Sequence, residues 1–100
     1  MRTFDEQAIV SIAPNANAVS NGRKLSSGNS FVKRMKSADD SLYFGECKGS
    51  GKSNYNVSID FEKEGEPVFR CSCPSRQFPC KHAIGLMFEM KEGKSFETAE

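Results

Sequence analysis

The chain has 100 residues, of which 37% are hydrophobic, and this fits one small domain with a thin core. Its formal net charge of +1 is much lower than the strongly positive charge that is typical of nucleic-acid-binding proteins. It has no apolar run as long as a membrane span, and Asp5 and Glu6 lie where a signal peptide needs its apolar core. We therefore expect a cytoplasmic protein without membrane association, whose cysteines stay reduced and favour metal binding over disulfides.

Residues 1–36 are predicted to form an interrupted N-terminal helical segment within this single domain, 1–100. Pro14 can open a helix, and the run of serine, glycine and asparagine at 26–30 weakens or ends it. The apolar residues within 31–35 follow, as a strand or an irregular segment that crosses the core. A polar turn is expected directly after them, before the second part of the chain.

Residues 42–92 are predicted to contain a β-hairpin, a further strand and a helix. Apolar and polar residues alternate strictly over 55–61, which is typical of a half-buried strand. The segment 42–47 precedes it as the hairpin partner, and 68–73 forms the third strand. The sequence thus predicts a three-stranded antiparallel sheet.

The best helix is predicted at 83–92, where apolar side chains cover an arc of roughly 200° and leave only Gly85 and Glu89 on the polar side. A surface helix needs a narrower apolar stripe, so either the N-terminal segment or another segment or partner covers the surplus. The internal explanation is favoured, because apolar patches of this kind are uncommon on monomers. The polar tail at 93–100 is expected to fray.

Three of the four cysteines and the only histidine lie between positions 71 and 82. Cys71 and Cys73 are two apart in a strand, so both sulfurs point to one face. The proline-containing turn after them lets the chain fold back, so that Cys80, just ahead of the helix, and His82, in its first turn, approach from the opposite side. Three thiolates and one imidazole close a tetrahedral zinc shell. We predict that these four residues bind Zn²⁺, in preference to three buried free thiols and a surface histidine.

A zinc ion with four protein ligands keeps no open position for water or substrate, so the predicted metal is structural and the chain is not an enzyme. The site carries a net charge of −1, which Arg76 and Lys81 are placed to offset unless they are ordinary surface charges. The remaining cysteine, Cys47, is an alternative ligand, a redox-active thiol or a buried small apolar residue. The last interpretation is favoured, because free cysteine is often buried and inert.

The pattern Cys-x-Cys, six residues, Cys-x-His resembles the SWIM-type zinc finger. The sequence from about Ile9 to Met90 is similar to that of the small bacterial SWIM-finger proteins. The resemblance implies a ββα zinc unit with Cys71, Cys73, Cys80 and His82 as ligands. It also implies a role in DNA binding or in protein–protein interaction. The expected fold is therefore α+β: a small zinc-stapled domain with an N-terminal helical segment, a three-stranded antiparallel sheet and a C-terminal helix.

Two functions compete on these observations. The first is a zinc-stabilised interaction module that binds another protein, based on the near-neutral charge and the broadly apolar final helix. The alternative is a DNA-binding module, whose phosphate contacts would come from basic residues between positions 23 and 52. These residues are Arg23, Lys24, Lys33, Arg34, Lys36, Lys48 and Lys52. Nucleotide binding is not expected, because the glycine-rich run at 45–53 has five residues where a phosphate loop has four.

Overall fold

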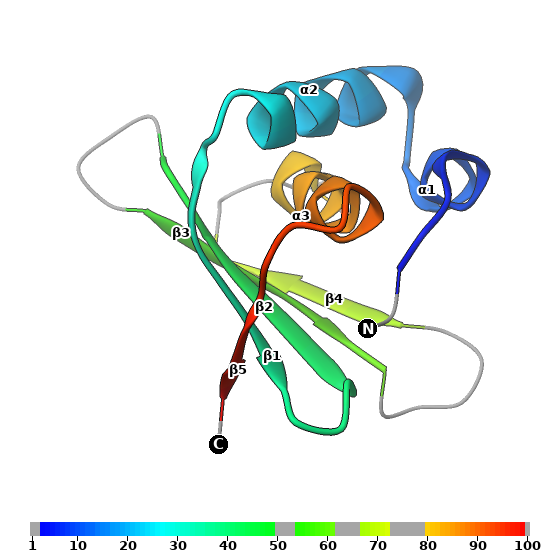
Figure 1. Ribbon diagram of the computed structural model, residues 1–100. Coiled ribbons are helices and arrows are strands. Elements are labelled where there is room, and N and C mark those ends of the chain that lie inside the picture. Colours follow the sequence, from blue (N-terminus) through cyan, green and yellow to red (C-terminus); the bar gives the residue numbers. More distant parts are fainter. Residues whose placement is uncertain (1–2, 50–53, 62–66, 73–79, 100) are drawn as a thin grey trace.

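The computed structural model describes residues 3–49, 54–61, 67–72 and 80–99. These residues form an α+β fold in which a five-stranded sheet carries all three described helices on one face (Figure 1). No described helix is long and apolar enough to cross a membrane. The elements are α1 (Glu6–Ile12), α2 (Ala16–Ser27), β1 (Phe31–Ser37), β2 (Leu42–Cys47), β3 (Tyr55–Asp60), β4 (Val68–Cys71), α3 (Lys81–Lys91) and β5 (Glu97–Ala99).

The N-terminal helical segment consists of two short helices, each of which begins at its own capping side chain. The Asp5 carboxylate accepts a hydrogen bond of 2.7 Å from the amide of Ala8, and the Asn15 side chain accepts one of 2.8 Å from the amide of Ala18. Such caps satisfy amides that the first helical turn leaves without partners. Helix α2 ends at Ser27, within the run where the sequence predicts an end. The prediction of a helical segment over 1–36 is too long, because its last residues belong to β1.

The sheet has five strands rather than the predicted three, in the order β4-β3-β2-β1-β5. Strand β1 lacks a regular alternation because its pairing with β2 shifts register between Phe31 and Lys33, which is the mark of a bulge. Strand β5 has only three residues and pairs in parallel with β1, and Arg34 Nε donates a hydrogen bond of 3.0 Å to the carbonyl of Ser95 just before it. The tail was expected to fray, but this parallel pairing orders it.

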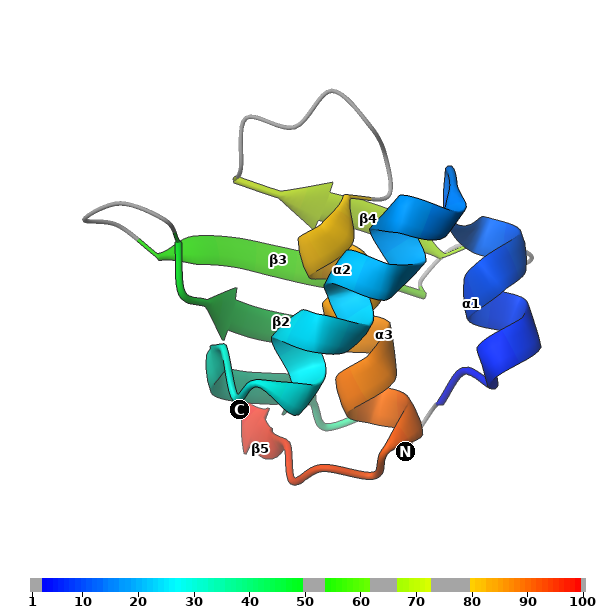
Figure 2. The same cartoon turned by 90° about the horizontal axis from the view of Figure 1, so that it is seen from above.

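Helix α3 lies between the sheet and α2, so it is buried on every side (Figure 2). On the sheet side it covers the apolar residues of the inner face, which include Tyr43, Val57 and Ile59. On the other side, the backbones of α2 and α3 approach closely where Gly22 meets Gly85. A Cβ at Gly22 would lie only 2.9 Å from the amide nitrogen of Gly85, which is too close for a larger residue. The N-terminal segment therefore covers the wide apolar arc of the final helix, as the sequence analysis favours.

The predicted polar side of α3 is also buried, and Glu89 has none of its surface exposed. Its carboxylate accepts a 2.5 Å hydrogen bond from the Ser26 hydroxyl. It also forms ion pairs with Arg34 at 3.2 Å and with Lys94 at 2.6 Å. The sequence prediction of an exposed Glu89 is wrong, because α2, β1 and the segment after α3 converge on this carboxylate and supply it with partners. A buried carboxylate requires such partners.

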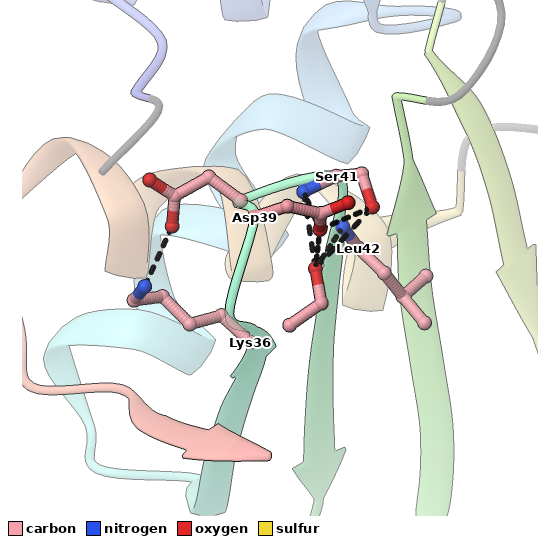
Figure 3. Close-up of polar contacts among 6 residues, drawn as sticks. Lys36, Asp39, Ser41 and Leu42 are labelled. Atoms are coloured by element: carbon pink, nitrogen blue, oxygen red, sulfur yellow. Dashed lines mark hydrogen bonds and ion pairs between the residues drawn. The ribbon is translucent and has the colours of Figure 1, made fainter. Parts of the chain in front are cut away.

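The β1–β2 turn is the polar turn that the sequence predicts, and its charges are internally paired (Figure 3). The Asp39 carboxylate accepts hydrogen bonds from the hydroxyls of Ser37 and Ser41, both at 2.7 Å, and from the amide of Ser41 at 3.1 Å. These bonds, that from Ser37 above all, lower the pKa of Asp39 to about 2. Lys36 forms an ion pair of 2.6 Å with Asp40 in the same turn. These contacts fix the connection between the two strands.

The second face of the sheet carries none of the described helices (Figures 1 and 2). We call this surface the open face. The strand register places the following residues on it: Lys33, Met35, Leu42, Phe44, Glu46, Asn56, Ser58, Asp60, Val68, Arg70 and Glu97. Leu42 keeps 40% of its surface exposed, while Met35, Phe44 and Val68 are half-buried by their neighbours. The open face thus combines partly exposed apolar side chains with a mixture of charges.

Candidate metal centre

Two of the predicted ligands come from the start of α3. Cys80 is the N-cap residue, with an extended backbone (φ −77°, ψ 171°), and His82 lies in the first turn. N-cap side chains usually accept a hydrogen bond from the helix, but Cys80 forms no such capping bond. This arrangement was predicted from the sequence, and it directs the Cys80 sulfur and the His82 ring to one region beside the sheet.

The third predicted ligand in the described residues is Cys71, at the end of β4. It pairs with Val57 of β3, and Phe69 pairs with Ile59, so both β4 residues face the helix side of the sheet. The predicted sharing of one face by the core residue and the metal ligand is therefore confirmed for Phe69 and Cys71. Cys71 is half-buried, whereas Cys80 and His82 are 1% and 4% exposed.

The distances between the three side chains fit a tetrahedral zinc shell. His82 Nδ1 lies 3.8 Å from the sulfur of Cys71 and 3.8 Å from that of Cys80. All three ligand atoms lie within 4.8 Å of one another. Zinc bonds of about 2.3 Å to sulfur and about 2.0 Å to nitrogen, at tetrahedral angles, would separate a sulfur from a nitrogen by about 3.5 Å. The donor set and its spacing therefore fit Zn²⁺, with Nδ1 as the coordinating nitrogen.

The fourth predicted ligand, Cys73, lies outside the described residues, as does Arg76. Lys81, the other residue proposed to offset the charge of the site, is exposed at the first position of α3. Its position next to Cys80 is compatible with both roles considered for it.

Tyr55 is a neighbour of the site that sequence analysis assigned only to the core. Its ring and that of His82 have centroids 4.8 Å apart, with an angle of 50° between their planes. Packing against the Tyr55 ring restricts the rotation of the imidazole and keeps Nδ1 directed at the two sulfurs. The alternating pattern of β3 indicates that Tyr55 lies on the inner face of the sheet. The sequence alone could not show that it packs against His82.

A family-model comparison identifies this region. Residues 55–91 match the SWIM zinc finger family. Over these residues the chain is similar to a SWIM zinc finger. The matched residues include β3, β4 and α3, which are the ββα unit that the resemblance implies. Comparison with curated proteins and with solved structures gives no match.

The match to the SWIM zinc finger family and the grouped side chains of Cys71, Cys80 and His82 indicate a zinc-binding protein. The SWIM finger is a structural module. When bound, the ion supplies a rigid link between β4 and the start of α3. Within this chain, the pairing of β4 with β3 positions Cys71. The N-terminus of α3 holds Cys80 and His82 close together.

Cys47 is buried on the inner face of the sheet, opposite Tyr55, and it is not part of the described metal-binding group. Burial raises the pKa of its thiol to about 11. Both observations agree with the interpretation of Cys47 as a buried, inert residue rather than a ligand or a redox-active thiol.

We predict that Cys47 resists alkylation in the zinc-loaded protein. With a pKa near 11, only about 0.1% of the thiol is ionised at pH 8, and the thiolate is the reactive form. Labelling with iodoacetamide, followed by peptide mass spectrometry, should leave Cys47 unmodified until zinc is chelated in urea. Equal labelling rates in the folded and the unfolded protein would contradict this.

Those of the predicted DNA-contacting basic residues that the structure describes are not gathered on one surface. Arg34 and Lys36 pair with Gly45 and Tyr43 in the register and therefore face the helix side, where they bind Glu89 and Asp40 respectively. Arg23 forms an ion pair with Glu6 at 2.5 Å and lies over the Phe88 ring, 4.7 Å from its centroid.

The other basic residues of this set within the described ranges do not share one side of the molecule. Lys24 is exposed on α2, whereas Lys33 lies on the open face of the sheet, opposite Glu46 in the register. Lys48 is exposed after β2, and Lys52 lies outside the described residues. The bulge in β1 decides this division, because it changes which side of the sheet each following residue faces.

Proposed function

We propose that the zinc ion is a structural centre held by Cys71, Cys73, Cys80 and His82, in a module that binds another protein through the open face. Four protein ligands would leave no position for substrate, so this proposal assigns the chain no enzymatic activity. The ion stabilises the packing of α3 on the sheet, and the sheet presents the binding surface on its other side.

The open face is the observation that carries the proposal. It holds the apolar side chains of Leu42, Phe44 and Val68, none of which a described helix covers. Protein interfaces commonly combine an apolar centre with polar and charged residues around it. The broad apolar surface of α3, on which the sequence-based argument for protein binding rested, does not support the proposal because α2 covers it.

The arrangement of charges favours protein over DNA. Binding to duplex DNA requires several cations on one surface that can reach phosphates together. Among the basic residues named for this role, Arg23, Arg34 and Lys36 already have carboxylate partners. On the open face, the charges of Lys33 and Arg70 are accompanied by Glu46 and Glu97.

Site-specific photo-crosslinking tests the proposal. A photoreactive amino acid replaces Ser58, next to Phe44 on the open face, or Lys24, on the exposed side of α2 as a matched control. Protein adducts are expected from position 58, should resist nuclease, and should be absent or much weaker from position 24. Equal adducts from both positions, or adducts to DNA, would overturn the proposal.

A second measurement addresses the DNA alternative directly. Fluorescence anisotropy with duplex DNA is expected to give no binding at about 50 mM salt. A binding constant for DNA whose logarithm falls with the logarithm of the salt concentration, with a slope of about −0.9 per neutralised phosphate, would support the alternative instead.

A further inference from the structure

We propose that the open face binds a second copy of this chain, in a dimer whose two-fold axis runs along β2. This inference rests on the proposed function, since it names the partner of the same surface. It is based on the order of residues across the sheet.

One row of side chains crosses all five strands of the open face. The strand register aligns, from one edge of the sheet to the other, Glu97, Met35, Phe44, Ser58 and Arg70. The row therefore has a carboxylate at the β5 edge, a guanidinium at the β4 edge, and Phe44 on the central strand β2. Glu97 and Arg70 are both exposed, and neither has an ion pair with another described residue.

This order makes the row complementary to itself. Rotation by 180° about an axis along β2, in the plane between two stacked sheets, reverses the strand order of the second copy. Phe44 then faces Phe44 of the second copy, and Arg70 faces Glu97 at both edges. Stacked sheets pack about 10 Å apart with strands aligned within about 30°, so these long side chains can meet. A two-fold interface requires this self-complementarity.

The rows on either side of Phe44 are compatible with the same axis. Leu42, which is 40% exposed, would contact Leu42 of the second copy. The two copies of Glu46 would also approach each other, but each has Lys33 beside it in the register to offset its charge. The central strand thus contributes two apolar contacts, while the charged pairs at the edges set the orientation.

The size of the face sets the expected affinity. Five strands about 4.8 Å apart, with six residues of about 3.3 Å each in the central ones, span roughly 24 by 20 Å. This area of about 480 Å² per copy is below the roughly 600–1,000 Å² per partner of stable interfaces and is typical of weak, transient ones. We expect a reversible dimer with a dissociation constant on the order of 10 μM.

Sedimentation equilibrium of the purified zinc-loaded protein tests the inference. Phe44→Glu should abolish the dimer, and Arg70→Glu and Glu97→Arg should each weaken it at least tenfold. The double variant Arg70→Glu/Glu97→Arg should recover most of the affinity, because it reverses the pair without losing it. Lys24→Glu, an exposed charge reversal on α2, should leave the dimer unchanged. Circular dichroism and zinc content confirm that each variant is folded.

Recovery by the double variant would support the inference, since a loss of folding or of general charge balance would not produce it. A wild-type protein that stays monomeric near 1 mM, or a double variant no better than either single one, would overturn it. If the chain is monomeric and position 58 crosslinks to a different protein, the proposed function is supported and only the dimer is ruled out. Absence of any protein adduct from position 58 would remove both.

Discussion

Replacing Cys80 by serine is expected to abolish stoichiometric zinc binding and to unfold the unit formed by β3, β4 and α3. Cys80 is 1% exposed, and its sulfur lies 3.8 Å from His82 Nδ1, so the substitution removes a donor from the centre of the group. Structural zinc contributes about 10–16 kcal/mol of apparent binding free energy near neutral pH. A small domain has a total stability of only about 5–15 kcal/mol, so its folding cannot survive the loss of the ion.

Zinc content by mass spectrometry and thermal unfolding by circular dichroism measure this effect. The matched control is Cys47→Ala, which removes a cysteine that is equally buried but lies outside the metal-binding group. It should keep one zinc ion per chain and lose only the stability that a small core truncation costs. A Cys80→Ser protein with one tightly bound zinc and an unchanged melting temperature would contradict the assignment of Cys80 as a ligand.

Replacing Glu89 by glutamine is expected to lower the free energy of unfolding by about 3 kcal/mol. Removal of one member of a buried ion pair typically costs about 3–5 kcal/mol, and the lower value applies because Arg34 and Lys94 keep 27% and 28% of their side chains exposed. Glutamine preserves the volume and can still accept the hydrogen bond from Ser26. The loss therefore reports on the charge of the buried carboxylate.

Urea denaturation of the zinc-loaded protein measures this loss, with Glu92→Gln as the control on the same helix. The Glu92 side chain is 56% exposed, and its contact with Lys91 is 3.8 Å, so this substitution should change stability by less than about 0.5 kcal/mol. Equal effects of the two substitutions would show that the buried cluster of Ser26, Arg34, Glu89 and Lys94 does not hold the two layers together.

The elements that depend on local sequence were predictable. Alternation of apolar residues located β3, and the spacing of the cysteines placed Cys80 just ahead of the final helix. These signals are short-range, because the two-residue period of a strand and the geometry of a helix start are properties of neighbouring residues. The grouping of Cys71, Cys80 and His82 follows from the same local rules.

The features that sequence analysis missed depend on contacts between distant segments. Strand β5 exists because it pairs in parallel with β1, some sixty residues earlier in the chain. Glu89 was assigned to a polar helix side because its partners Ser26 and Arg34 lie 63 and 55 residues away. Because of the bulge in β1, Arg34 faces this carboxylate and not solvent. The number of basic residues in the sequence therefore could not predict whether they share one surface.

X-ray absorption at the zinc edge tests the central assignment most directly, because it reports the atoms bound to the ion in the intact protein. The predicted shell has three sulfurs at about 2.3 Å and one nitrogen at about 2.0 Å. Cys73→Ser should abolish stoichiometric zinc binding as Cys80→Ser does, which tests the ligand that lies outside the described residues. A wild-type shell with two sulfurs and a bound water would contradict a closed, structural site.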